Sequence, residues 1–298
     1  MTCRLTAARR KVVGLPALLA LAVAGCGGDT ETSSAGDGSS GEARPAGGGQ
    51  GPVHVHGLGV NPKDRALFIA THTGLFRVGP DERRADRVGE SDQDTMGFTI
   101  VGSDRFLGSG HPGALQRGPA LLGLIRSDSG GDDWQPVSLA GKADFHILRS
   151  AHRRVYGFDS ANSRLMISRD YGESWDERQP PAPLIDLAVD PEDPRRLLAS
   201  GVDGLFESRD EGRRWRPSGD EIGLLAWPAR DRLYLVDGRG AVQVSGDGGR
   251  RWRQRGGIGG QPAALLAEGR EGLYVALPDG TIKRSRDGGR SWAVRSRP

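Results

Sequence analysis

The six histidines of this chain, which all lie between positions 54 and 152, are the residues best suited to bind a metal ion. His54 and His56 are two positions apart in an expected strand, so their side chains share one face. Imidazole together with a thioether such as that of Met96 suits copper, whereas imidazole together with a carboxylate suits zinc. One hypothesis is therefore a copper or zinc site held by His54, His56 and His146.

These histidines can act together only if the fold brings the starts of several strands to one place. His56, Met96, His146 and Asp186 lie near the starts of expected strands in four successive repeats, described below. We therefore predict a single ligand-binding site, made of His56, Met96, His111, Asp144, His146 and Asp186. The alternative is that these polar side chains only fill the centre of the fold and bond with one another.

For the other polar residues, the neighbouring sequence predicts whether they face the centre of the fold or lie in exposed turns. His111 lies in the longest internal loop, which could fold over the same site. Asp144 and Glu221 are further candidates to face the centre of the fold. His72 and His152 are expected to be exposed turn residues.

The elements that must position these residues are repeats. Five segments follow the pattern Ser-x-Asp-x-Gly-x-x-Trp, and their tryptophans are separated by 41, 40, 37 and 40 residues. A fixed period of this length is the signature of a propeller or a solenoid. The segment at 127–134 has Ser129 where Asp is expected, so we expect a looser turn there. The pattern residues of the other four are Ser168, Asp170, Gly172, Trp175, Ser208, Asp210, Gly212, Trp215, Ser245, Asp247, Gly249, Trp252, Ser285, Asp287, Gly289 and Trp292.

We interpret these segments as turns that stabilise themselves. Ser and Asp side chains hydrogen-bond the backbone of their own turn, glycine supplies a positive φ, and tryptophan packs on the hairpin. Because such turns lie on the outer rim, their aspartates are expected to be structural rather than catalytic or metal-binding.

Short apolar runs broken by Asp-Gly turns precede each segment and predict β-hairpins. A first unit near residue 53 keeps these runs but lacks the pattern. Because every unit consists of strand and turn signals, the fold class is all-β. Six units of about 41 residues fill 53–298. We predict a β-propeller of six four-stranded blades around a channel, and the repeat count favours six over seven. The expected innermost strands lie near 53–60, 96–101, 145–149, 185–189, 222–226 and 263–267.

The repeats resemble the BNR or Asp-box repeats of sialidases and many other secreted propellers. The segments Val53–Leu58, Met96–Ile100, Ser109–Gly113 and Asp144–His146 are similar to those of a group of bacterial lipoproteins nominally labelled glycosylhydrolase-like. The resemblance covers nearly all of 53–298 and implies a fold and an exported location. Because propellers host many functions, it implies little about chemistry.

A sialidase-type glycoside hydrolase is the runner-up hypothesis. That chemistry needs three arginines, a Tyr–Glu pair and an acidic Asp, but the sialidase Arg-Ile-Pro signature is missing. Tyr156, Tyr234 and Tyr274 occupy equivalent positions in their repeats, as packing residues do. If the chain is a glycosidase, Asp186 and Glu221 are the candidate carboxylates, provided that they lie close together.

The N-terminus predicts export and lipid attachment. Residues 1–25 read as a signal peptide, with four basic residues followed by an apolar run that is too short to span a bilayer. Val23-Ala24-Gly25-Cys26 resembles a lipobox, which implies cleavage before Cys26 and a lipid on its thiol. Residues 27–52 are rich in Gly, Ser and acidic residues, so we expect them to form a flexible tether.

The charge and the cysteine content exclude several kinds of function. Without residues 1–25 the chain carries 37 basic and 38 acidic residues, which argues against nucleic-acid binding. The only cysteines are Cys3 and Cys26, so the folded part has neither a disulfide nor a cysteine nucleophile. The best reading is a membrane-anchored propeller that binds an extracytoplasmic protein or glycan at one mouth of its channel.

Overall fold

The computed structural model describes residues 51–114 and 116–298. The predicted signal peptide, Cys26 and nearly all of the predicted tether therefore lie outside the described residues. The described part of the chain forms strands, turns and loops, with no helix long and apolar enough to cross a membrane.

Twenty-four strands follow one another along the described residues. They are β1 (Val55–Val60), β2 (Leu67–Thr71), β3 (Gly74–Val78), β4 (Asp86–Val88), β5 (Asp94–Gly102), β6 (Arg105–His111), β7 (Leu124–Ser127), β8 (Gln135–Ser138), β9 (Phe145–Ala151), β10 (Arg154–Asp159), β11 (Arg164–Ser168), β12 (Asp176–Arg178), β13 (Leu184–Val189), β14 (Leu197–Gly201), β15 (Gly204–Ser208), β16 (Arg216–Gly219), β17 (Gly223–Ala229), β18 (Arg232–Asp237), β19 (Ala241–Ser245), β20 (Arg253–Gly257), β21 (Ala264–Glu268), β22 (Gly272–Ala276), β23 (Ile282–Ser285) and β24 (Ala293–Ser296).

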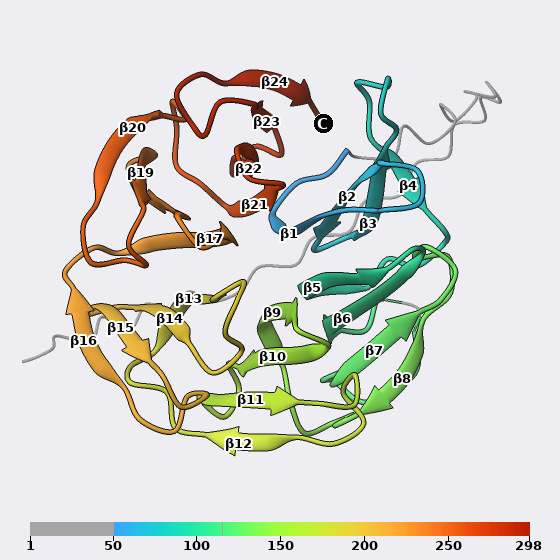
Figure 1. Cartoon of the computed structure of the whole chain (residues 1–298). Helices are drawn as coiled ribbons and strands as arrows, with labels where there is room; N and C mark the ends of the chain where they lie inside the picture. Colours follow the sequence, from blue (N-terminus) through green and yellow to red (C-terminus); the bar gives the residue numbers. More distant parts are fainter. Residues whose placement is uncertain (1–50, 115) are drawn as a thin grey trace, which may run out of the picture. The chain divides into compact units, whose positions relative to one another are not determined.

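Each group of four consecutive strands forms one antiparallel sheet, and the six sheets are the blades of a propeller (Figure 1). The first strand of each blade contacts the first strand of the next blade, and β21 contacts β1, so these strands surround the centre. The prediction of six four-stranded blades is confirmed. The expected innermost strands match β1, β5, β9, β13, β17 and β21, with ends that differ by a few residues.

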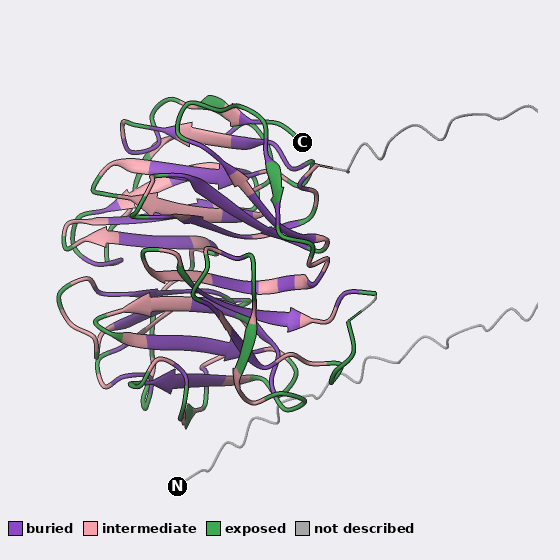
Figure 2. Ribbon diagram, turned by 90° about the vertical axis from the view of Figure 1, so that its right-hand side faces the viewer, coloured by how far each residue is buried: buried purple, intermediate pink, exposed green. Residues whose placement is uncertain are grey.

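Apolar side chains from neighbouring blades pack together at six interfaces. Phe68 of blade 1 packs with Phe106 of blade 2, and Leu198 of blade 4 packs with Leu235 of blade 5. The strand centres are buried and the connecting turns are exposed (Figure 2). Burial of apolar surface between blades thus holds each sheet against the next, because a single sheet could not cover its own faces.

The ring closes without exchange of a strand between its ends. The chain enters on the inner strand β1 of blade 1 and finishes on the outer strand β24 of blade 6. Val55 and Ile69 of blade 1 share one apolar cluster with Tyr274 and Ile282 of blade 6. The guanidinium of Arg295 also donates hydrogen bonds to carbonyl oxygens of the loop that follows β3.

The five Ser-x-Asp-x-Gly-x-x-Trp segments form the turns between the third and fourth strands of blades 2 to 6. In blade 3, Ser168 Oγ accepts a hydrogen bond from Gly172 N (2.7 Å) and donates one to Asp170 Oδ1 (2.7 Å). Asp170 also accepts hydrogen bonds from the side chain and backbone of Ser174, which hold the pKa of its carboxyl well below the ordinary value. Gly172 has a φ of 97°, which disfavours other residues. Ser208, Ser245 and Ser285 make the same two bonds. Each Oγ accepts a hydrogen bond from the N–H of the glycine in its turn and donates one to the aspartate.

The segment that lacks the aspartate forms the same kind of turn. Ser127 Oγ accepts a hydrogen bond from Gly131 N (2.8 Å), and Ser129 Oγ accepts one from Asp133 N (2.9 Å). The hydroxyl of Ser129 therefore takes over one bond of the missing carboxylate. Its distance to Ser127 Oγ is 3.3 Å, longer than the 2.7 Å between Ser168 Oγ and Asp170 Oδ1, so the turn keeps its form with weaker bonds.

Candidate functional site

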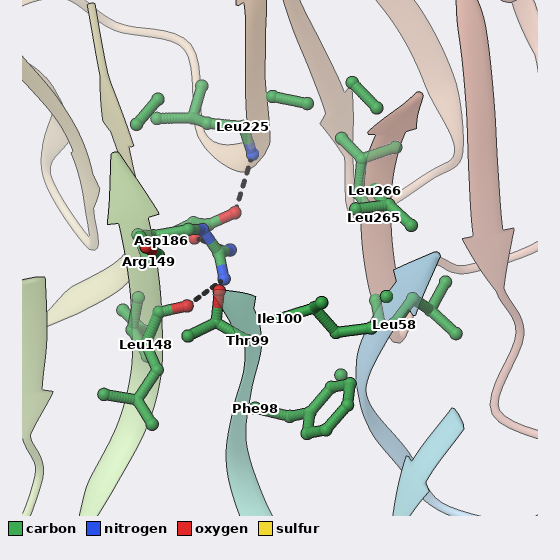
Figure 3. A pocket seen from close by; sticks show the side chains of 18 of the residues that line it. Leu58, Phe98, Thr99, Ile100, Leu148, Arg149, Asp186, Leu225, Leu265 and Leu266 are labelled. Atoms are coloured by element: carbon green, nitrogen blue, oxygen red, sulfur yellow. Dashed lines mark hydrogen bonds and ion pairs between the residues drawn. The ribbon is translucent and has the colours of Figure 1, made fainter. Parts of the chain in front are cut away.

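The centre of the propeller contains a cavity of about 750 Å³ that is lined by the first strands of all six blades. Most of the lining residues are apolar (Figure 3), including Leu58, Ile100, Leu148, Leu265 and Leu266. Some polar residues of the lining, among them Arg149 and Asp186, are bonded to one another, as the alternative of polar side chains that fill the channel expects. A channel of this size and character can accommodate an apolar side chain or a short segment of another molecule.

A β-bulge near the start of the first strand recurs in four successive blades. The register between the first and second strands skips one residue at His56, Met96, His146 and Ile185. Bulges redirect side chains, and all four residues line the channel. The prediction that residues near the strand starts of blades 1 to 4 converge on the channel is therefore correct, although the bulged residue of blade 4 is Ile185 rather than Asp186.

Asp186 also lines the channel, but its carboxylate is buried and fully engaged. Oδ1 accepts hydrogen bonds from the Arg149 guanidinium and from Leu187 N (2.7 Å), and Oδ2 accepts one from Leu225 N (2.8 Å; Figure 3). Arg149 in turn donates to Leu187 O (3.2 Å) and Leu148 O (3.0 Å). Asp186 thus joins blades 3, 4 and 5, a structural role that leaves no oxygen free for proton transfer.

The predicted carboxylate pair is not assembled in the channel. Among the described residues, only Asp186 and Glu268 contribute carboxylates to its lining, and Glu221 does not belong to it. Glu268 is paired with Arg65 and with Arg284, whose Nη2 is 3.0 Å from Glu268 Oε2. Both lining carboxylates are therefore held by arginines, unlike the acid and base that a glycosidase needs.

The tyrosines pack, as their equivalent positions indicated. Tyr156, Tyr234 and Tyr274 are buried. Tyr156 Oη donates to Pro194 O (3.0 Å) in the next blade, and Tyr234 Oη donates to Arg270 O (3.1 Å). Burial raises the pKa of Tyr156 to about 12, so its phenol is a poor nucleophile at neutral pH.

Imidazoles and carboxylates of blades 1 to 3 gather where the first strands begin. We call this group the His/Asp mouth; it consists of His56, His72, Asp94, His111, Asp144 and His146. At its centre, Asp94 Oδ2 is 2.8 Å from His72 Nδ1 and 3.5 Å from His111 Nδ1. Asp94 Oδ1 is 3.7 Å from His56 Nε2.

His72 was not expected here. It lies in the β2–β3 turn and is partly exposed, as predicted, but its ring contacts His56 at 4.3 Å between centroids and faces Asp94. The turn is fixed by Thr71, whose Oγ1 accepts a hydrogen bond from Thr73 N (3.1 Å) and donates one to Gly74 O (2.8 Å). The antiparallel pairing of β1 with β2 brings this turn beside the start of β1.

A second half of the His/Asp mouth is built around Asp144. His146 Nε2 is hydrogen-bonded to Asp144 Oδ2 (2.8 Å), and His111 Nε2 lies 3.5 Å from the same oxygen. Burial opposes ionisation of Asp144, but the hydrogen bond from His146 and the nearby His111 hold its pKa below the ordinary value. His111 therefore lies between Asp94 and Asp144, but it is the last residue of strand β6 and pairs with Asp94 across the sheet, so the expectation that it lies in a loop is wrong.

The remaining candidates lie outside this arrangement. His54 contacts the His72 ring at 5.3 Å between centroids and has no contact of its own with Asp94. His152 lies in the β9–β10 turn, where its Nε2 is hydrogen-bonded to Asp190 O (2.8 Å). Among the described residues, the ligand atoms of His54, His56 and His146 do not come close enough to form the predicted metal site, and His146 is hydrogen-bonded to Asp144.

Burial makes the imidazole of His56 less basic than an exposed one. Loss of solvent, and to a lesser extent the neighbouring His72, lowers the pKa of His56 to about 4, although Asp94 opposes this shift. The imidazole is therefore neutral at pH 7. Three buried atoms of the His/Asp mouth, His56 Nε2, Asp94 Oδ1 and Asp144 Oδ1, have no hydrogen-bond partner among the described residues.

Comparisons with known proteins identify the fold. No protein-family model matches the chain, and no curated protein matches its sequence. Among solved structures, the chain is similar to a GH74 xyloglucanase from Xanthomonas campestris, with 19% identity and a TM-score of 0.55. The match covers 82% of this chain and 45% of the xyloglucanase, so the chain spans about half the length of that enzyme.

Two similar structures are complexes. One is YCF48 bound to D1 peptide, with 13% identity and a TM-score of 0.54 over 76% of this chain and 91% of that chain. The other is a nidogen/laminin complex, with 14% identity and a TM-score of 0.60 over 78% of this chain and 93% of that chain. At these identities the comparisons establish the propeller fold and nothing finer.

Proposed function

We propose that this chain is an exported, lipid-anchored propeller that binds an extracytoplasmic protein partner in its channel, through the His/Asp mouth. The observation that carries the proposal is the channel itself. Apolar residues predominate among those that line it, and the two carboxylates in its lining are engaged by arginines. Such a wall favours binding of a segment of another molecule over acid–base chemistry by these two carboxylates.

The similar structures agree with a binding role. The two complexes are matched over nearly their whole chains, whereas the GH74 xyloglucanase is matched over less than half of its length. A glycoside hydrolase is the weaker alternative, because it requires two carboxylates with opposite protonation states across a substrate. Attachment through Cys26 would keep the binding site at the membrane surface.

Site-specific photocrosslinking in cells of the native host tests both parts of the proposal. A photoreactive residue replaces Ile185, which lines the channel and is 37% exposed, or Val294, an equally exposed residue (40%) on the outer strand β24. We expect a discrete crosslinked partner from position 185 and none from position 294. We also expect the crosslinked product in the membrane fraction, and in the soluble fraction after Cys26→Ser.

Crosslinking that is equal at both positions would contradict binding in the channel. A Cys26→Ser chain that stays in the membrane fraction would contradict lipid anchoring. The two outcomes are independent, so one part of the proposal can fail while the other stands.

A further inference from the structure

Three potential metal ligands converge in the His/Asp mouth from different parts of blades 1 and 2. His56 comes from the bulge of β1, His72 from the β2–β3 turn and Asp94 from the start of β5. One ligand atom from each lies within 4.8 Å of the others. Nitrogen and oxygen ligands at about 2.0–2.2 Å from a tetrahedral zinc ion are separated by roughly 3.3 Å. Side-chain shifts of about an ångström would therefore bring all three to bonding distance.

Two of these residues also contain buried atoms that lack a partner. His56 Nε2 and Asp94 Oδ1 are 3.7 Å apart, beyond hydrogen-bond distance. A buried polar atom without a hydrogen bond is costly, so such atoms are rare in native proteins. A cation between the two atoms would satisfy both in the imidazole tautomer with its proton on Nδ1, because Nε2 then presents a lone pair to it, as the carboxylate oxygen does.

The surroundings suit a metal site as well. His111 Nδ1 lies 3.5 Å from Asp94 Oδ2, and its Nε2 lies 3.5 Å from Asp144 Oδ2. His111 and Asp144 thus stand next to the carboxylate of Asp94, and residues beside a metal ligand help to orient it.

We propose that His56, His72 and Asp94 bind a divalent transition-metal ion, Zn²⁺ or Cu²⁺. Imidazole nitrogen favours these ions over Ca²⁺ and Mg²⁺, which prefer oxygen ligands. Three protein ligands leave a coordination position for water or for a group of a bound molecule. The site goes beyond partner binding in the apolar channel and does not depend on it.

The test is competitive titration of the purified, metal-stripped full-length protein with Zn²⁺ and with Cu²⁺ against a chromophoric chelator. Loss of an outer-shell group alone weakens metal binding by 10–100-fold. We therefore expect His56→Gln, His72→Ala and Asp94→Asn each to weaken binding by about 100-fold or more. His152→Ala, which removes a histidine outside the His/Asp mouth, should change affinity by less than about twofold.

Folding of each variant is checked by circular dichroism and by its melting temperature with and without zinc. Zinc should raise the melting temperature of the natural protein and of His152→Ala, but not of Asp94→Asn, because a ligand stabilises only the state that binds it. A folded Asp94→Asn protein that binds zinc as tightly as the natural protein would overturn the proposal. So would loss of binding in His152→Ala, or a natural protein that binds neither ion.

Discussion

Asp186→Ala is expected to lower the free energy of unfolding by about 3 kcal/mol. The substitution leaves the guanidinium of Arg149 and the backbone N–H groups of Leu187 and Leu225 without their acceptor. Breaking a buried ion pair costs about 3–5 kcal/mol, and the lower figure applies because Arg149 is about one-third exposed. Urea unfolding followed by tryptophan fluorescence measures the change.

The matched control is Asp203→Ala in the same blade, at the exposed β14–β15 turn. Exposed substitutions of this kind change stability by about 0.5 kcal/mol or less. Asp186→Asn keeps one acceptor oxygen and should fall between the two. A loss for Asp186→Ala as small as that of Asp203→Ala would mean that this carboxylate does not join the blades and is free for another role.

Phe106→Ala is expected to cost about 3–5 kcal/mol, the largest loss that we predict for an apolar residue. The side chain is fully buried between blades 1 and 2, with its ring 4.7 Å from that of Phe68 and 5.6 Å from that of Phe98. Its removal loses the transfer free energy of the ring and leaves a cavity that the two sheets cannot easily close.

Phe106→Leu is the control, since it keeps most of the apolar volume and should cost clearly less. Val294→Ala, at an exposed position on β24, should be nearly neutral. A loss for Phe106→Ala as small as that of Val294→Ala would indicate that packing between these blades is loose and contributes little to stability.

The blades could be predicted because each repeat contains its own strand and turn signals. The Ser-x-Asp-x-Gly-x-x-Trp segments recur at a nearly constant period, and each fixes the same turn through bonds such as Gly289 N to Ser285 Oγ (2.9 Å). Local hydrogen bonds and local hydrophobic pattern thus agree with the global fold, the condition under which sequence reasoning succeeds.

The site could be predicted only in part, because it depends on register and on contacts between blades. A bulge shifts the side chains by one position, so Ile185 rather than Asp186 is equivalent to His56 and His146. Asp186 instead points to a backbone N–H of the next blade. His72 was missed because its role arises from the pairing of β1 with β2, and its neighbour Asp94 lies in another blade. The closeness of His54 and His56 in the sequence suggested that both bind one metal ion, but the group with suitable spacing is His56, His72 and Asp94, without His54.

Hydrolysis by the purified full-length protein of a panel of fluorogenic glycosides, with and without Zn²⁺ or Cu²⁺, tests most directly whether this propeller binds rather than cleaves. The panel includes a sialoside and a xyloglucan oligosaccharide. We predict no turnover of any substrate, because both channel carboxylates are engaged by arginines and those of the His/Asp mouth are paired with histidines. Turnover by the natural protein that is abolished in a folded Asp186→Asn variant would contradict this account and make the channel an active site.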